Sequence, residues 1–304
     1  MPEPRPADMR CGFVALVGAP NVGKSTLLNR LVGAKVSIVT PKVQTTRSPV
    51  RGIAMRGGAQ IVFVDTPGIF TPRRRLDRAM VQAAWSGAGD ADLVALLIDA
   101  KKGLDEDARA IINRLADHAP QKVCIINKID LVPRESLLAL ADEANRLARF
   151  DRIFMISAAS GDGVDDVLNY FAESVPAGPH HYPADEISDL PERLMAAEVT
   201  REKLYLRLHE ELPYQSTVET DSWRELKDGS VRIEQTIFVE RESQRKIVLG
   251  EGGRMIKAIS MDARKELAAS LERKVHLFLH VKVREDWEND PERYRAAGLE
   301  FPKD

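Results

Sequence analysis

A glycine-rich loop that follows a short apolar run constrains this chain more than any other feature. Residues 18–25 read Gly-Ala-Pro-Asn-Val-Gly-Lys-Ser, directly after the apolar residues 13–17. This is the G-x-x-x-x-G-K-[ST] pattern of a phosphate-binding loop between a strand and a helix. Gly18 and Gly23 let the backbone curl so that successive N–H groups point inward, and the start of the following helix adds partial positive charge. The pattern predicts a nucleotide phosphate site.

Two side chains of this loop carry chemistry of their own. Lys24 can reach the β- and γ-phosphates of a nucleotide, and the Ser25 hydroxyl can ligate Mg²⁺. The alternative is a glycine-rich turn without a ligand, and the strand-like and helix-like flanks argue against it. The predicted loop residues are Gly18, Ala19, Pro20, Asn21, Val22, Gly23, Lys24, Ser25 and Thr26.

Composition limits the class of protein further. A length of 304 residues favours two domains, and 44% hydrophobic residues can form real cores. The net charge of −2 means that any nucleic-acid surface must be local. The chain has 2 cysteines, which allow neither a disulfide framework nor a zinc site. No stretch has the length and apolarity of a membrane span, and the N-terminus lacks the apolar core of a signal peptide.

Short apolar runs alternate with helical patterns in the first half of the chain. Runs without polar alternation indicate strands that are buried on both faces, so we expect a mostly parallel α/β sheet with helices on both sides. The predicted strands are 13–17, 60–64, 93–98, 122–126 and 152–156, and the predicted helices include 107–115 and 136–149. Ligands of such sheets bind at the carboxyl ends of the strands.

A different rhythm begins after the proline-rich residues 175–183. A helix over 192–211 is followed by two strands near 216–222 and 230–240, a glycine loop at 250–253, a helix to about 272 and an alternating strand over 275–283. The order α-β-β-α-β predicts a smaller α+β domain. The expected division is a disordered lead-in 1–10, a first domain 11–175, a linker 176–190, a second domain 191–285 and a C-terminal tail 286–304.

Further motifs stand at the ends of the predicted strands. Asp65, Thr66, Pro67 and Gly68 follow 60–64; the carboxylate can hold Mg²⁺ through water, and the Gly68 N–H can meet a γ-phosphate. Before that strand come Gln44, Thr45, Thr46 and Arg47, where a threonine hydroxyl can cap Mg²⁺ while the γ-phosphate is present.

The remaining motifs select the base. Asn127, Lys128 and Asp130 follow 122–126, and Ser157, Ala158 and Ala159 follow 152–156. A carboxylate at 130 can accept from both N1–H and the exocyclic amine of guanine, a donor pair that adenine lacks. A backbone N–H near 158 can meet guanine O6. Each motif alone could be turn chemistry, but five in this order predict a GTP site.

On these residues the chain resembles the Era family of bacterial GTPases, which pair a Ras-like GTPase domain with a type II KH domain that binds RNA. The resemblance rests on residues 18–26, 44–47, 65–68 and 127–130, on Glu198-Val199-Thr200-Arg201-Glu202-Lys203 and Glu211-Leu212-Pro213-Tyr214, and on the loop 250–253. It runs from about residue 11 to about residue 300. It implies that GTP and GDP are the ligands and that GTP is hydrolysed to GDP and phosphate.

Hydrolysis needs an explanation because the position after Gly68 is Ile69, where Ras-like enzymes carry a water-orienting glutamine. Relatives with a hydrophobic residue there often use K⁺ held in part by the asparagine that matches Asn21, with backbone ligands that would come here from Thr40 and Lys42. The resulting assignment makes Lys24, Thr46, Asn21 and Gly68 the catalytic set, with Ser25, Thr46 and Asp65 around Mg²⁺, Asp65 through water.

The second domain carries a candidate RNA clamp, since KH domains hold single-stranded nucleotides with a G-x-x-G loop before a helix. The predicted contacts are Gly250, Glu251, Gly252, Gly253, Arg254 and Lys257. Between residues 241 and 284 there are 11 Lys or Arg and 5 Asp or Glu, a local excess of 6 positive charges. Family members commonly carry lysine inside this loop, where Glu251 would repel a phosphate.

The resemblance also implies the biological role. It predicts a cytoplasmic, monomeric switch that binds the 3′ end of small-subunit (16S) ribosomal RNA in its GTP state and acts in assembly of the 30S subunit. Peripheral contact with the inner face of the cell membrane is known in the family, although no amphipathic anchor here demands it. Three alternatives remain open at this point. They are a constitutive RNA-binding module with a structural nucleotide site, a related tRNA-modification GTPase and an ATP-using enzyme.

Overall fold

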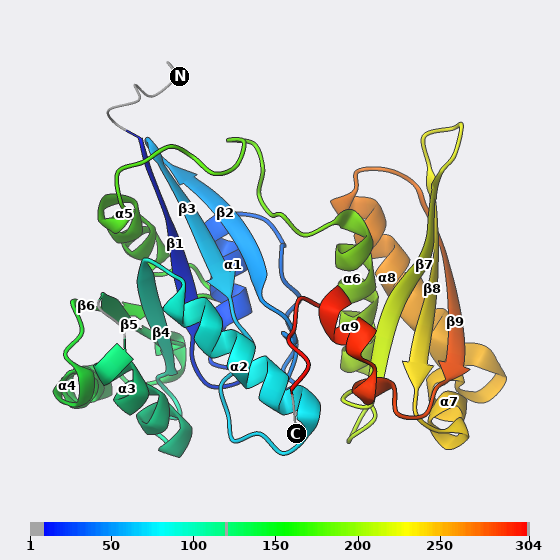
Figure 1. The fold of residues 1–304 in the computed structure, drawn as a ribbon, viewed down its shortest axis with the longest axis horizontal. Coiled ribbons are helices and arrows are strands. Elements are labelled where there is room, and N and C mark those ends of the chain that lie inside the picture. The colour runs from blue at the N-terminus through cyan, green and yellow to red at the C-terminus, as the bar shows by residue number, and fades with distance from the viewer. Residues whose placement is uncertain (1–8, 119–120, 303–304) are drawn as a thin grey trace. The chain divides into compact units, whose positions relative to one another are not determined.

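The computed structural model describes residues 9–118 and 121–302, and by compactness the chain divides into two units. The first comprises Met1–Asp189 with Tyr294–Asp304, and the second comprises Leu190–Arg293. Each unit has its own sheet (Figure 1). The expected lead-in falls outside the described residues up to residue 8, and Arg10 already begins the first strand.

The sheet of the first unit has 6 strands in the order β2-β3-β1-β4-β5-β6. Neighbours pair in parallel except β2 with β3, which confirms the predicted mostly parallel sheet. Every residue of β3 and β4 is buried, as continuous apolar runs require. The strands are β1 (Arg10–Val17), β2 (Val50–Arg56), β3 (Ala59–Asp65), β4 (Leu93–Asp99), β5 (Lys122–Asn127) and β6 (Arg152–Ile156).

Helices cover both faces of this sheet (Figure 1). α1 and α5 pack together over β2 and β3, whereas α2 packs on β1 and α4 on β5. The carboxyl ends of the parallel strands meet at one edge, where the sequence places its motifs. The helices are α1 (Lys24–Val32), α2 (Arg75–Gly89), α3 (Glu106–His118), α4 (Glu135–Ala148) and α5 (Val164–Ser174), with a short 3₁₀ helix η2 (Ile129–Leu131) after β5.

The antiparallel edge strand β2 is absent from the predicted strands. Its sequence interrupts the apolar pattern with Arg51 and Gly52, so no continuous run stands out. The glycine has a structural reason, because a Cβ at Gly52 would lie 2.7 Å from Leu28 Cδ1 and 2.8 Å from Val32 Cγ2 of α1. The missing side chain therefore allows α1 to pack closely on the sheet edge.

Residues 176–189, expected to be a linker, lie against the first unit. The Gln60 side chain donates to the Tyr182 carbonyl at 2.8 Å and accepts from the Tyr182 N–H at 3.0 Å. Ile53 N–H donates to the Ile187 carbonyl at 2.9 Å, which caps the outer edge of β2. The compact unit consequently extends to Asp189 rather than ending near residue 175.

The C-terminal segment belongs to the same unit. The rings of Tyr294 and Phe301 meet edge to face with centroids 4.9 Å apart, and the Arg75 guanidinium lies 5.0 Å from the Phe301 centroid. Gln82 on α2 donates to Glu300 at 2.7 Å. Glu300 and Phe301 are thus held against α2, although a tail was expected here.

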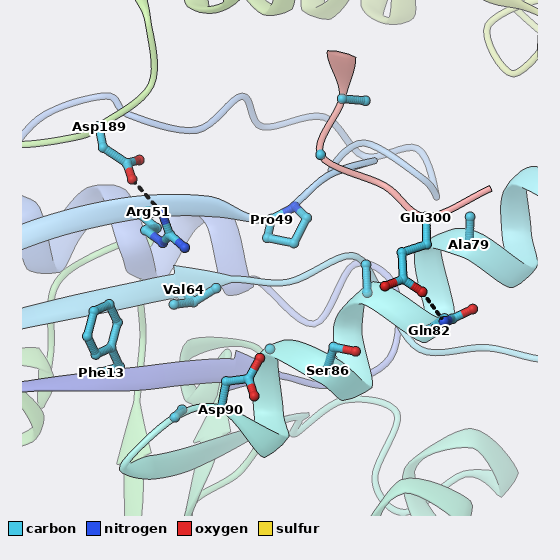
Figure 2. A pocket seen from close by; sticks show the side chains of 15 residues that line it. Phe13, Pro49, Arg51, Val64, Ala79, Gln82, Ser86, Asp90, Asp189 and Glu300 are labelled. Atoms are coloured by element: carbon cyan, nitrogen blue, oxygen red, sulfur yellow. Dashed lines mark hydrogen bonds and ion pairs between the residues drawn. The ribbon is translucent and has the colours of Figure 1, made fainter. Parts of the chain in front are cut away.

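A cavity of about 520 Å³ lies between this segment, α2 and the sheet. Figure 2 shows the ion pair of Arg51 with Asp189, 2.8 Å apart, at one side of the cavity and the Gln82–Glu300 hydrogen bond at the other. Its described lining includes no residue of the glycine-rich loop. The cavity is therefore separate from the predicted nucleotide site.

The second unit packs helices against a sheet of 3 strands in the order β7-β8-β9. β7 and β8 pair antiparallel and β8 and β9 pair parallel. Its core joins Leu204 and Tyr205 of α6 to Ile237, Val248 and Ile259. The elements are α6 (Glu192–Arg207), β7 (Ser216–Glu225), β8 (Val231–Val239), α7 (Glu242–Leu249), η3 (Glu251–Gly253), α8 (Arg254–Ser270), β9 (Val275–Val283) and η4 (Trp287–Asn289). Helix α9 (Pro291–Ala296) begins in this unit and ends in the first, which resumes at Tyr294.

Two details of this unit differ from the prediction. α6 ends at Arg207, not near residue 211, because Leu208 adopts an extended backbone and is buried in the core. Helix α7 precedes the glycine loop and is absent from the expected α-β-β-α-β order. It shows few apolar residues, and its buried side chains are Gln244 and Val248. The observed order α-β-β-α-α-β is the complete form of the predicted α+β domain.

Candidate nucleotide and RNA sites

The glycine-rich loop joins β1 to α1 at the carboxyl edge of the sheet. Gly23 caps α1 with φ 99°, and Gly18 has φ 152°. A Cβ at Gly23 would lie 2.3 Å from Asn127 Nδ2, and one at Gly18 would lie 2.6 Å from the Leu97 carbonyl oxygen. Both glycines are therefore required by space, and Gly23 also by a backbone conformation that other residues rarely adopt.

Lys24 is folded into this loop. Its Nζ donates to the carbonyl oxygens of Gly18 and Ala19, both at 3.1 Å, and the side chain is buried. Burial lowers the pKa of Lys24 to about 8, against the opposing attraction of Asp65. A bound phosphate would supply the negative charge needed to compensate the buried Lys24 ammonium, so the position suits an anionic ligand.

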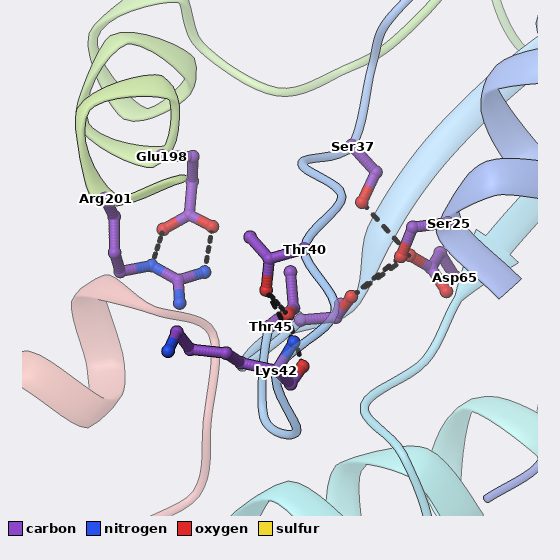
Figure 3. Close-up of polar contacts among 9 residues, drawn as sticks. Ser25, Ser37, Thr40, Lys42, Thr45, Asp65, Glu198 and Arg201 are labelled. Carbon is purple, nitrogen blue, oxygen red and sulfur yellow. Dashed lines mark hydrogen bonds and ion pairs between the residues drawn. The ribbon is translucent and has the colours of Figure 1, made fainter. Parts of the chain in front are cut away.

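Three hydroxyls converge on Asp65 at the end of β3. Ser25 Oγ donates to Asp65 Oδ2 at 2.6 Å, Ser37 Oγ donates to it at 3.1 Å and Thr46 Oγ1 at 3.3 Å, while Ser25 and Thr46 lie 2.9 Å apart (Figure 3). Asp65 Oδ1 is buried with no hydrogen-bond partner among the described residues. Burial raises the pKa of Asp65, and Lys24 and the hydroxyls oppose that rise. An unpaired buried carboxylate oxygen beside two hydroxyls fits a hard divalent cation such as Mg²⁺.

The loop before β2 lies beside the phosphate loop. Asn21 Nδ2 donates to the Pro41 carbonyl at 2.9 Å. Thr40 and Thr45 share a hydrogen bond of 2.6 Å between their hydroxyls, and Thr40 also accepts from the Lys42 N–H at 3.1 Å (Figure 3). Asn21 thus touches the segment 40–42 that was expected to meet it.

The remaining residues of this loop are also fixed in place. Gln44 adopts a left-handed backbone with φ 55°. Thr46 and Arg47 are buried. The predicted loop 44–47 is therefore folded against the first unit in this structure.

The Asp-Thr-Pro-Gly turn is packed tightly against the phosphate loop. Thr66 Oγ1 donates to the Leu16 carbonyl at 2.8 Å, and Pro67 is buried. A Cβ at Gly68 would lie 2.9 Å from Pro20 Cα. Ile69 N–H donates to the Gly18 carbonyl at 3.0 Å, and the Ile69 side chain is buried. The position that carries glutamine in Ras-like enzymes is apolar and enclosed here.

Asn127 and Lys128 tie the phosphate loop to the neighbouring strand ends. Asn127 Nδ2 donates to the Val22 carbonyl at 2.8 Å, and its Oδ1 accepts from the Ala158 N–H at 2.9 Å. Lys128 Nζ donates to the Asn21 carbonyl and to Asp99 Oδ2, both at 2.6 Å. Asp99 was not predicted, although it closes β4 at the same edge as the other motifs.

The residues predicted to select the base follow in the chain. Asp130 is exposed in η2. Ser157 N–H donates to Asp162, and Ala158 N–H is taken by Asn127, so among the described residues Ala159 offers the remaining amide of the three. Arg30 of α1 donates to the carbonyls of Ala158 and Ala159, a support that the motif search did not include.

Several of the predicted residues line two adjoining hollows, although Asp65, Asn127 and Asp130 line neither of them. One, of about 380 Å³, is lined by Pro20, Asn21, Gly23, Lys24, Ser25, Thr26, Ile38, Val39, Thr40, Pro41, Gln44, Thr45, Thr46, Gly68 and Lys128. The other, of about 400 Å³, shares Thr26 and Val39 with it and includes Ala158 and Ala159.

The glycine loop of the second unit connects α7 to α8. Gly250 has φ 71°, and a Cβ there would lie 2.7 Å from Met255 Cβ. Gly252 and Gly253 also have positive φ but open surroundings, which leave their backbone accessible. Glu251 forms an ion pair with Arg254, and both side chains are exposed. The positive charge of Arg254, predicted to contact RNA, is thus already paired with Glu251. Lys257 is exposed one turn further along α8.

The motif 198–203 lies on α6 of the second unit, outside the glycine loop. Glu198 and Arg201 pair on α6 (Figure 3), and Arg201 is almost fully buried. Lys203 forms ion pairs with Glu202 and Glu266. These contacts lie within the second unit and stabilise α6. Across residues 9–118 and 121–302, no group of three or more His, Cys, Asp or Glu could hold a metal ion.

Comparisons with known proteins agree with this geometry. A family model described as a 50S ribosome-binding GTPase matches residues 13–128, and a KH domain model matches residues 211–288. The curated GTPase Era of Bradyrhizobium sp. (strain BTAi1) is 66% identical over 298 residues, covering 98% of this chain and 97% of that protein. The chain belongs to the GTPase Era family.

Other Era proteins match just as completely. GTPase Era of Rhizobium meliloti is 65% identical, covering 97% of this chain and 94% of that protein. Aquifex aeolicus Era, as a variant bound to GDP·AlF4⁻, superposes with a TM-score of 0.90 at 38% identity, covering 95% of this chain and 99% of that one. Era in complex with MgGDPNP and nucleotides 1506–1542 of 16S ribosomal RNA gives a TM-score of 0.89 at 38% identity, with the same coverage. None of the described helices has the length and apolar character needed to cross a bilayer.

Proposed function

We propose that this Era-family protein binds GTP with Mg²⁺, hydrolyses it to GDP and phosphate, and binds the 3′ end of 16S ribosomal RNA through its KH domain. The observation that carries the first part is the convergence of Lys24, Ser25, Thr46 and Asp65 at one sheet edge. The relative solved with MgGDPNP and 16S ribosomal RNA supports both parts.

Mg²⁺ fits the hydroxyl cluster at the end of β3. Ser25 and Thr46 would ligate it directly and Asp65 would hold one of its water ligands, because the carboxylate lies behind both hydroxyls. The bound cation would neutralise charge on the β- and γ-phosphates. Lys24 would leave its two carbonyl partners for the phosphates, where it stabilises the charge that develops during transfer.

Asp130 would select guanine. Its carboxylate is exposed two residues after Lys128, which lines the first hollow, and would accept from N1–H and the exocyclic amine. The Ala159 amide, at the second hollow, would donate to O6. Adenine offers no such donor pair, which argues against the ATP-using alternative. Asn127 and Lys128 support this arrangement by holding the phosphate loop and the 158 loop together.

K⁺ is the proposed aid to hydrolysis, because Ile69 cannot orient water. Asn21 would hold the ion together with backbone carbonyls of the segment 40–42, which its side chain already contacts at Pro41. We expect GTP turnover to be faster in K⁺ than in Na⁺ buffer and Asn21→Ser to lose that difference. Equal turnover in the two buffers would remove K⁺ from the mechanism.

The second unit would clamp single-stranded RNA. The open backbone of Gly252 and Gly253 would contact phosphates, and Arg254, Lys257 and Glu251 would border them. Ile247 on α7 is 56% exposed beside the loop and offers an apolar surface to a base. We further propose that the protein acts as a cytoplasmic monomer on the 30S subunit, with any membrane contact peripheral.

The deciding experiment measures affinity for a 3′-terminal 16S ribosomal RNA fragment in the presence of a GTP analogue and of GDP at one stated salt concentration. Tighter binding with the analogue establishes a GTP-dependent switch. Equal binding in both states favours the constitutive RNA-binding alternative. The tRNA-modification alternative predicts a reactive cysteine or a cofactor pocket. Burial argues against the cysteine, because it raises the pKa of Cys124 to about 12 and also raises that of Cys11.

A further inference from the structure

A hydrogen bond joins the loop before β2 to the helix that follows the Asp-Thr-Pro-Gly turn. Gln44 Nε2 donates to Asp77 Oδ1 at 2.9 Å. Gln44 lies two residues before Thr46, whose hydroxyl reaches Asp65, and Asp77 lies in the first turn of α2. The bond thus connects the two segments that flank the γ-phosphate position in the proposed function.

Asp77 is built to hold this position. Its side chain is 4% exposed, and its second oxygen accepts from the N–H groups of Arg73 and Arg74, both at 3.0 Å. A carboxylate at a helix N-terminus is favoured by the helix dipole and satisfies otherwise unpaired amides. Both oxygens are therefore occupied, one by the helix start and the other by the loop.

Gln44 pays for this contact in backbone conformation. Its φ of 55° lies in the left-handed region, which costs a non-glycine residue free energy. Such a conformation persists only where surrounding contacts enforce it. The Asp77 carboxylate supplies one, so losing the bond should release the loop and with it the position of Thr46.

We propose that Asp77 is a positioning residue for GTP hydrolysis, which holds Thr46 in place through Gln44 and makes the two loops order together. This inference rests on the proposed GTPase function. Because GDP lacks the γ-phosphate that both loops would face, the clasp acts on turnover and not on GDP affinity. Ordering either loop would favour ordering of the other, since each stabilises one end of the same bond.

The test is a double-mutant cycle on the full-length protein with Gln44→Met and Asp77→Ala, because an asparagine at 77 could still donate to a turned Gln44 amide. We expect each single variant to lower kcat for GTP about tenfold with GDP affinity changed less than about twofold, and the double variant to be no slower than the worse single variant. In the GTP-analogue state, amide exchange should rise together in residues 40–46 and 73–78 of Gln44→Met.

Asp105→Ala is the matched control, because Asp105 caps α3 by accepting from the Ala108 N–H at 2.9 Å and belongs to neither loop. It should lose similar stability and keep kcat. Additive losses in the cycle, or an equal kcat loss in Asp105→Ala, would overturn the inference. A wild-type protein that fails to hydrolyse GTP would refute the proposed function, whereas active wild type with unchanged variants refutes the clasp alone.

Discussion

Replacing Glu251 with glutamine removes the carboxylate that pairs with Arg254 in the KH loop. Both groups are largely exposed, at 87% for Glu251 and 77% for Arg254, so the pair adds little to stability but occupies the guanidinium. A phosphate that approaches Gly252 and Gly253 meets this carboxylate and must displace it to reach Arg254. Glu251→Gln frees the guanidinium and should add one phosphate contact to the complex.

The size of the effect follows from counterion release. One additional contact with a single strand steepens the slope of log K against log salt by about 0.7. Between about 50 and 200 mM salt, that change alone alters affinity by a factor of about 2.5. We therefore expect Glu251→Gln to bind the ribosomal RNA fragment about fivefold more tightly at about 50 mM salt and about twofold more tightly at about 200 mM.

Fluorescence anisotropy with a labelled 3′-terminal fragment at four salt concentrations measures both affinity and slope. Glu272→Gln is the matched control, because Glu272 is exposed beyond the far end of α8 and its removal changes the net charge equally. Equal gains in the two variants would mean that only overall charge matters. An unchanged slope in Glu251→Gln would show that Arg254 makes no phosphate contact, and the argument would fail.

The nucleotide site gives three further expectations. Asp130→Asn should weaken GDP binding by about 10²–10⁴-fold and favour xanthosine diphosphate, whose 2-oxo group accepts where the guanine amine donates. Competition binding checks this, and retained guanine preference would move base selection elsewhere. Gly23→Ala should lower the free energy of unfolding by about 2 kcal/mol or more, since its Cβ would lie 2.3 Å from Asn127 Nδ2. Gly33→Ala, with φ 78° but open space, should lower it only by the backbone strain of about 1 kcal/mol. Equal losses in chemical denaturation would contradict the clash. Burial lowers the pKa of Lys24 to about 8, and a bound phosphate would raise it again. GDP binding near that pH should therefore take up about half a proton and weaken as pH rises. Calorimetry in two buffers measures the proton uptake, and the absence of uptake would place Lys24 away from the phosphates.

The sequence predicted most of the sheet because its strands are continuous apolar runs. Strand 152–156 matches β6 residue for residue, and the other four predicted runs lie within longer strands. Edge strand β2 was not predicted because Arg51 and Gly52 interrupt its apolar pattern. Its position is set by contacts with α1 and Ile187, which the local sequence pattern does not encode. Helix α7 was not predicted for a similar reason, since its buried residues include the polar Gln244.

The candidate site was predictable in its motifs but not in its supports. Spacing places Ser25, Thr46 and Asp65 at one edge, and their hydroxyl and carboxylate oxygens do lie within hydrogen-bond distance. Ser37 and Asp77, which complete that network, belong to no motif and are separated from their partners along the chain. Only the folded arrangement shows that such residues act together.

The KH-containing unit is an insertion in chain order, because the chain leaves the first unit after Asp189 and rejoins it at Tyr294. Two covalent connections therefore tether it, and a single proteolytic cut near residue 190 would leave it attached by the other. Removal of the residues from Tyr294 onward would eliminate one connection and the contacts of Phe301 and Glu300 with α2. The RNA-binding unit would then be joined to the first unit by one connection only.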